Sequence, residues 1–148
     1  MLKLYNSFSN QLEPFKPLEK NTVKMYHCGP TVYDYAHIGN FRAYLFADIL
    51  RRYLEYKGFK IKQVMNITDV GHMTEEGEEE NTGEDKIELA ARKEKKKPQE
   101  IADFYTQAFM QDIEKLGMLS AHHYPKATEH VMAMIKLIQK LLDTKKAY

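Results

Sequence analysis

The stretch VKMYHCGPTVYDYAHIGN, residues 23–40, decides the fold because a strand pattern in it runs directly into the start of a helix. Its first six residues are rich in strand formers and precede Gly29-Pro30, which predicts a buried strand ending at Cys28. A helical pattern follows from about Gly39 to Lys57, and Gly58 is a natural C-terminal stop. Residues 59–67 then predict a second strand.

The predicted helix carries apolar residues around most of its first half, which indicates deep burial. One face at helical spacing comprises Ile38, Phe41, Leu45, Ile49 and Tyr53. The second strand shows simple alternation instead. Its shared face comprises Phe59, Ile61, Gln63, Met65 and Ile67.

Strand, helix and strand in this order predict a right-handed crossover, and therefore a parallel sheet in an α/β fold. Ligands of such sheets bind at the carboxyl ends of the strands. Residues 28–40 and 68–72 both follow a predicted strand, so we expect them to meet at the ligand-binding edge. The pattern predicts one unit over residues 1–148, with an acidic loop at about 69–85 and a helical part at about 86–148, where Thr128 is expected to cap the last helix. The sheet is expected to be incomplete, because no further strands follow.

Bulk composition narrows the class of protein. The 148 residues are 43% hydrophobic and 29% charged, as in an ordinary globular domain. The net charge of +1 is too small to give the strong positive electrostatic field that is typical of nucleic-acid or membrane binders. A single cysteine forms no internal disulfide, which suits a reducing cytoplasm. The apolar runs are too short for a signal peptide or a membrane span. The acidic loop and the basic run at 92–97 are interpreted as solvated surface, and contact of the basic run with RNA stays open.

The connection between the first strand and the helix suits a phosphate group. Helix N-termini carry free N–H groups and partial positive charge, Gly39 allows close approach to the backbone, and His37 and Asn40 both offer hydrogen-bond donors. No GxGxxG or GxxxxGK[ST] is present. A histidine at a helix start is more often a capping residue, and spacing alone favours that alternative.

Cys28 has three interpretations from the residues alone: an apolar filler, a nucleophile beside His27 or His37, or one ligand of a metal. Zinc takes several protein ligands, and no C-x-x-C pair exists. The histidines show no ligand spacing; they are His27, His37, His72, His122, His123 and His130. The residues alone therefore favour the filler.

The segment YHCGPTVYDYAHIGNFRAYLFADILRRYL resembles the first signature of class I aminoacyl-tRNA synthetases, and specifically the cysteinyl-tRNA synthetase family. HIGN, residues 37–40, stands where that family has the HIGH tetrapeptide. Further segments similar to the family follow in order along the chain: NITDVGH, GEDKI, IADFYTQAF and YPKATEHV. The resemblance implies a Rossmann-like fold of the HIGH-type nucleotidylyl transferases, of which this chain would form the N-terminal half.

The resemblance also implies a reaction and its residues. Cysteine would attack the α-phosphate of ATP to give cysteinyl-adenylate, and the cysteinyl group would pass to tRNA(Cys). His37 and Asn40 would be catalytic, and the ATP site would comprise Pro30, Thr31, His37, Gly39 and Asn40. The amino-acid site would comprise Gly29, Thr31 and Thr68. Cys28 would be one ligand of a zinc ion that recognises the substrate thiolate, and Mg²⁺ would accompany ATP.

Two departures from the family pattern matter. Asn40 replaces the second histidine of HIGH, and asparagine keeps donors but carries no positive charge. The remaining zinc ligands, the KMSKS loop and the anticodon-binding domain lie beyond Tyr148 in the family pattern. We therefore expect an N-terminal fragment, inactive alone and poor at holding zinc through Cys28.

The intact enzyme is expected to be cytoplasmic, without membrane contact and monomeric. The alternatives are a cysteine ligase that passes the adenylate's cysteine to an amino-sugar thiol precursor, and a small HxGH-type nucleotidylyltransferase.

Overall fold

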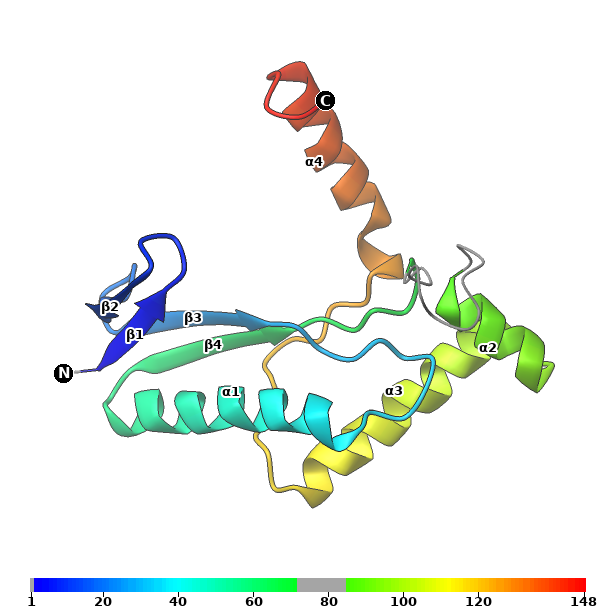
Figure 1. Ribbon diagram of the computed structural model, residues 1–148, viewed down its shortest axis with the longest axis horizontal. Helices are drawn as coiled ribbons and strands as arrows, with labels where there is room; N and C mark the ends of the chain where they lie inside the picture. Colours follow the sequence, from blue (N-terminus) through cyan, green and yellow to red (C-terminus); the bar gives the residue numbers. More distant parts are fainter. Residues whose placement is uncertain (1, 72–84) are drawn as a thin grey trace.

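The computed structural model describes residues 2–71 and 85–148, and the structural statements below concern these two ranges. Most of the predicted acidic loop lies outside the described residues. Figure 1 shows the elements in chain order: β1 (Lys3–Asn6), β2 (Gln11–Pro14), β3 (Thr22–His27), α1 (Ile38–Tyr56), β4 (Lys60–Met65), α2 (Lys86–Glu94), α3 (Pro98–Lys115), the short 3-10 helix η1 (Thr128–His130) and α4 (Val131–Asp143).

Strands β3 and β4 form the predicted parallel pair. Their register runs from Thr22 beside Lys60 to His27 beside Met65. Helix α1 connects them and lies along both strands (Figure 1). The strand–helix–strand prediction and the α/β class are therefore confirmed, although the first strand ends one residue before Cys28. The burial predicted for this strand is wrong for most of it, because Val23 is its one buried residue and Tyr26 is 67% exposed.

A third segment lies parallel to β4 on the edge away from β3, and the sequence did not reveal it. The amide of Met65 donates to the carbonyl of His123 at 3.1 Å, and the amide of Ile67 donates to that of Pro125 at 2.9 Å. Two isolated parallel bridges, at His123 and Lys126, complete this contact. The segment carries no alternating apolar pattern, so its strand-like backbone pairing leaves no trace in the residues.

The deep burial predicted for α1 is only partly correct. Its buried residues are Tyr44, Ala47, Asp48, Arg51 and Leu54. Much of the apolar stripe instead faces outward, with Ile38 88% and Ile49 63% exposed. The helix turns two charged residues toward the protein because both find partners there. Asp48 accepts from Arg52 and from the amide of Leu119 at 2.9 Å, and Arg51 binds the β4 side chain of Gln63.

The largest core cluster lies where α1 and α3 meet the carboxyl ends of the strands. Its buried members are Val32, Tyr44, Met65, Ile67, Ala102, Phe109 and Ile113. The face predicted for the second strand is confirmed, since Ile61, Gln63, Met65 and Ile67 are all buried. This cluster includes Val32 of the connection that follows β3. It therefore anchors the edge of the sheet where ligands are expected.

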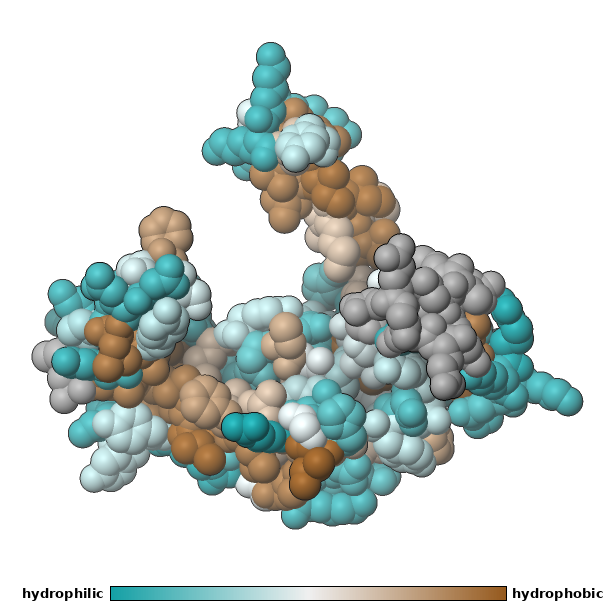
Figure 2. All heavy atoms as spheres, viewed as in Figure 1, coloured by the Kyte–Doolittle hydropathy of each residue, from teal (hydrophilic) through white to brown (hydrophobic). Residues whose placement is uncertain are grey.

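The two ends of the described chain pack less extensively. Strands β1 and β2 form an antiparallel hairpin. Helix α4 projects from the rest of the molecule and has no buried residue, and Figure 2 shows apolar side chains along it. Thr128 does not cap this helix as predicted, because α4 begins at Val131 and the Thr128 hydroxyl donates to Asp69 at 2.6 Å. None of the described helices is long and apolar enough to cross a bilayer.

Candidate active site at the strand ends

A pocket of about 300 Å³ lies between the end of β3 and the start of α1. Eight of its ten lining residues come from the connection between these elements. The lining comprises Gly29, Pro30, Thr31, Tyr33, Asp34, Tyr35, Ala36, His37, Asn40 and Tyr44. The structure thus brings together five of the residues expected at the site: Gly29, Pro30, Thr31, His37 and Asn40.

The connection stays paired with the chain that follows β4. Thr31 and Thr68 form an isolated parallel bridge. The amide of Thr68 donates to the carbonyl of Pro30 at 3.0 Å, and the amide of Val32 donates to the carbonyl of Thr68 at 3.1 Å. Thr68 therefore lies beside the pocket wall, although it is not among the lining residues. This pairing holds the two strand ends at one edge, as the parallel fold predicts.

His37 and Asn40 cap the start of α1 reciprocally. The amide of Gly39 donates to His37 Nδ1 at 3.0 Å, and the amide of His37 donates to Asn40 Oδ1 at 3.1 Å. Because each side chain uses its acceptor on a backbone N–H, the polar atoms that remain are donors: the Nε2–H of His37 and the NH₂ group of Asn40. The capping interpretation and the phosphate-binding interpretation are therefore compatible, since capping itself leaves donors at the pocket.

Asn66 is the residue at this edge that sequence reasoning missed. Its Oδ1 accepts from the Gly29 amide at 3.1 Å and from the Tyr26 hydroxyl at 3.0 Å. Its Nδ2 donates to the hydroxyl oxygen of Thr68 at 3.0 Å. One side chain thus joins β3, the glycine that follows it and the threonine beyond β4. The only sequence signal is a polar residue directly after a buried strand.

Gly29 is required by a close backbone contact. A Cβ at this position would lie 1.9 Å from the carbonyl oxygen of Asn66 and 2.7 Å from Cγ of Met65. At Gly39 the nearest atoms belong to the ring of His37, at 2.8 Å. The two glycines therefore serve different purposes: the first lets two backbones meet, and the second leaves room for the capping imidazole.

Cys28 is a free cysteine with an exposed side chain, next to the pocket. The pKa of Tyr44, which lines the pocket, is raised mainly by burial and further by the charge of the Cys28 thiolate. The filler interpretation is wrong for an exposed thiol. A zinc site needs about four ligands, and within the described ranges no three His, Cys, Asp or Glu side chains gather as a metal site. Cys28 can offer one ligand.

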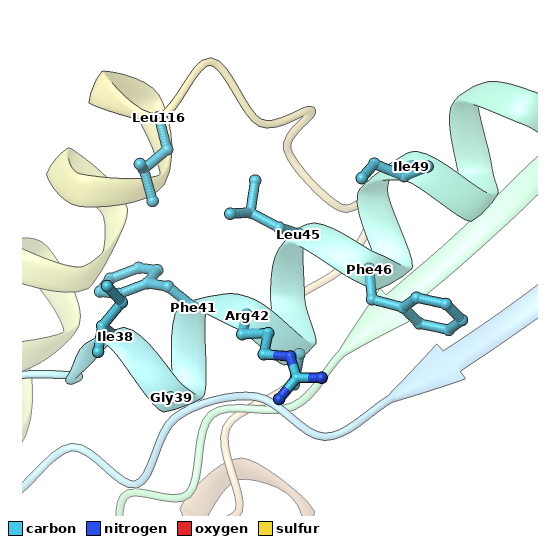
Figure 3. A pocket seen from close by; sticks show the side chains of 9 residues that line it. Ile38, Gly39, Phe41, Arg42, Leu45, Phe46, Ile49 and Leu116 are labelled. Atoms are coloured by element: carbon cyan, nitrogen blue, oxygen red, sulfur yellow. The ribbon is translucent and has the colours of Figure 1, made fainter.

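A second, larger hollow of about 1160 Å³ runs along the outward face of α1. Leu116, at the end of α3, faces the α1 side chains across it (Figure 3). Gly39 lines this hollow rather than the strand-end pocket. Its side chains are apolar apart from Arg42, so it lacks the convergent donors that mark the strand-end pocket.

Comparison with known proteins gives a consistent picture. The family model of the tRNA synthetases class I (C) catalytic domain matches residues 14–148. Among curated proteins, a cysteine–tRNA ligase of Treponema denticola is 48% identical over 140 residues, which cover 95% of this chain and 28% of the relative. One of Pyrococcus furiosus is 43% identical over 148 residues, covering 100% of this chain and 28% of the relative. The chain therefore spans about three tenths of the length of these relatives.

Proposed function

The chain belongs to the family of class I (C) tRNA synthetase catalytic domains, and from that premise we propose that it supplies the ATP- and cysteine-binding edge of a cysteine–tRNA ligase. Its fold would be the first half of a Rossmann-like sheet of the HIGH type. The substrates would be ATP, cysteine and tRNA(Cys). The observation that carries this proposal is the pair of donors that His37 and Asn40 leave at the pocket after capping α1.

The first reaction places specific demands on these residues. The carboxylate of cysteine attacks the α-phosphorus of ATP, a P–O bond forms, and pyrophosphate leaves with the electron pair of the bond that breaks. Negative charge grows on the phosphoryl oxygens during this displacement, and fixed donors stabilise it most when they need no reorganisation. The His37 Nε2–H and the Asn40 NH₂ group are held by hydrogen bonds through the opposite atoms of their side chains.

Asn40 suits this role without positive charge. Its amide donates at every pH, whereas an imidazole donates from a nitrogen that depends on tautomer and protonation. We therefore assign Asn40 a role as a neutral hydrogen-bond donor, which needs no positive charge. Pro30 and Thr31 would shape the ATP side of the pocket, Gly29 and Thr68 the amino-acid side, and Gly39 would let the adenine ring approach the helix.

Cys28 would contribute one thiolate to a zinc ion, whose chemistry is to bind the sulfur of the substrate in preference to the oxygen of serine. Among the described residues, no cluster of three His, Cys, Asp or Glu side chains joins it. Mg²⁺ would arrive with ATP. For the enzyme that contains these residues, we predict a cytoplasmic location and a monomeric state.

A chimera tests the proposal. Residues 1–148 would replace the matching segment of the Treponema denticola relative, so that any activity depends on this chain's pocket. We expect cysteine-dependent exchange of pyrophosphate into ATP, little exchange with serine, and charging of tRNA(Cys). Asn40→Ala should slow the exchange by about 10²-fold, the order found for one donor to a developing negative charge. A folded chimera without exchange, or an unchanged rate in Asn40→Ala, would contradict the proposal.

A further inference from the structure

A cluster of three aromatic rings continues from the strand-end pocket onto the surface beside α3. Tyr35 lines the pocket, and its ring makes T-shaped contacts with Phe104 at 6.1 Å and with Tyr105 at 5.1 Å between centroids. Phe104 and Tyr105 meet in the same way at 5.1 Å. We call these three rings the aromatic platform. Because Tyr35 is 59% and Phe104 46% exposed, the platform offers aromatic surface to solvent next to the pocket.

The platform is held in place from within the protein. Each ring contacts the other two, and α2 lies beside the helix that carries two of them (Figure 1). The Tyr105 hydroxyl donates to Glu94, the last residue of α2, at 3.0 Å, and the ring packs against buried Ile87, Ala91 and Ile101. A flat ligand that stacks on rings already held in place costs the protein little conformational freedom, which favours binding.

Positive charge lies beside these rings. Lys96 Nζ lies 5.4 Å from the centroid of the Phe104 ring, and residues 92–97 contain five basic side chains and one carboxylate. That carboxylate belongs to Glu94 and accepts from Lys96 at 2.7 Å, which holds the ammonium group near the ring. At the start of α2, Lys86 Nζ lies 5.5 Å from the centroid of Tyr33, which also lines the pocket. Cations therefore accompany aromatic rings at both ends of α2.

We propose that the aromatic platform and the basic run at 92–97 bind a single-stranded end of RNA and guide it to the strand-end pocket. The rings stack on unpaired bases, and the basic side chains contact the phosphates between them. Duplex RNA suits this surface less, because its bases stack on one another and offer no free face. This surface deepens the proposed function and rests on it for the identity of the RNA, because the acceptor end of tRNA(Cys) must reach the pocket to receive cysteine.

Three RNA probes separate stacking from charge. All share one fluorescein-labelled hairpin: the first is blunt, the second carries a four-nucleotide 3′ extension, and the third carries the same extension without its bases. The third probe thus keeps every phosphate of the extension. Binding to the full chain is measured by fluorescence anisotropy over a range of salt concentrations. We expect the extended hairpin to bind about tenfold more tightly than the blunt one, and the extension without bases to lose most of that gain.

Substitutions in the platform test the stacking. Tyr35→Leu and Phe104→Leu should each remove most of the tenfold gain, whereas Phe104→Tyr should retain it because the ring remains. Tyr56→Leu is the matched control, because Tyr56 is 82% exposed at the end of α1 and also has a lysine ammonium 5.8 Å from its ring centroid. Circular dichroism verifies that each variant is folded. If one leucine variant does not fold, the other still tests the stacking.

Substitutions in the basic run test the phosphate contacts. Lys95, Lys96 and Lys97 are replaced together by glutamine, and the control replaces three exposed lysines of the C-terminal part, Lys140, Lys145 and Lys146. The first set should reduce the slope of log K against log salt for the extended hairpin by about 2, since each contact with a single strand contributes roughly 0.7. The control set should leave that slope unchanged.

Several results would overturn this surface. Equal binding of the blunt and extended hairpins would do so, as would the absence of binding to any probe. A gain that survives in the extension without bases would show attraction by charge alone. Displacement of the RNA by an equal concentration of hexaglutamate would assign the surface to acidic peptides. An unchanged gain in both leucine variants would show that the rings do not stack on the bases.

The RNA surface and the ligase proposal fail separately. A chimera that charges tRNA(Cys), beside equal binding of the blunt and extended hairpins to the chain, would refute only the RNA surface. A chimera without pyrophosphate exchange, beside a retained preference for the extended hairpin, would refute the ligase proposal and leave a surface for single-stranded RNA.

Discussion

Replacing Gly29 by alanine should destabilise the whole fold, because the new methyl group meets backbone and not solvent. The Cβ would lie 1.9 Å from the carbonyl oxygen of Asn66 and 2.7 Å from Cγ of Met65. The first distance is less than a van der Waals contact by more than an ångström, so the chain after β3 must move away from the chain after β4. That movement breaks the bond from the Gly29 amide to Asn66.

The size of the effect follows from these two changes. Forced repacking of a close contact costs roughly 1–3 kcal/mol, and the lost hydrogen bond adds about 1 kcal/mol. We expect the free energy of unfolding to fall by about 2–4 kcal/mol. In a chain of this length each kcal/mol lowers the midpoint of thermal unfolding by roughly 2–4 °C, so a loss of about 5–15 °C is expected.

Gly39→Ala provides the matched control. Its Cβ would meet only the ring of His37, at 2.8 Å, and a side chain can rotate away. Alanine also favours the helix by up to about 1 kcal/mol, so this variant should unfold near the wild-type midpoint while the imidazole leaves its capping position. Urea and thermal unfolding by circular dichroism measure both variants. Equal midpoints for Gly29→Ala and Gly39→Ala would refute the close-contact argument.

Three further predictions concern stability and ionisation. Arg51→Met should lower the free energy of unfolding by roughly 2–4 kcal/mol, measured in urea, because the buried guanidinium donates to Gln63 and to a backbone carbonyl beyond α3. Asp69→Ala should cost about 1–2 kcal/mol and speed amide exchange at Thr128, which loses both of its bonds to the carboxylate. Burial, and then a hydrogen bond to a carboxylate on α2, raise the pKa of Tyr105 to about 12. Since an unfolded tyrosine ionises near 10, stability should fall between about pH 10 and 12, and less so in Tyr105→Phe.

The parallel unit was predictable because its signals are local. Each signal acts within a few residues: strand formers before Gly29-Pro30, helical spacing up to Gly58, and alternation in the second strand. The observed bounds of these elements differ from the predicted ones by one or two positions. His37 and Asn40 were found for the same reason, since a capping pair is separated by only three positions.

Features that depend on distant partners were not predictable. The pairing of residues 122–127 with β4 uses backbone atoms, which leave no pattern in the side chains. Asn66 meets Tyr26 from 40 positions away. On α1 the apolar stripe predicted a buried face that is only partly correct, because charge at Asp48 and Arg51 looks like a solvent signal until their partners are known. A residue's polarity alone does not say whether its hydrogen bonds are made to water or to the protein.

The same distinction explains how a pocket with few charges would bind the anionic groups that we propose for it. In His37, Asn40 and Asn66, one side-chain atom accepts a hydrogen bond from a backbone N–H. This bond orients the side chain, and it leaves the N–H groups of the side chain as donors. A histidine in place of Asn40 would need to accept through a ring nitrogen to keep the cap. The amide keeps the cap and two donor hydrogens whatever the pH. Asparagine at this position therefore keeps the acceptor that caps the helix and the donors that face the pocket. It lacks only the positive charge that a histidine can carry, and the capping geometry does not use that charge.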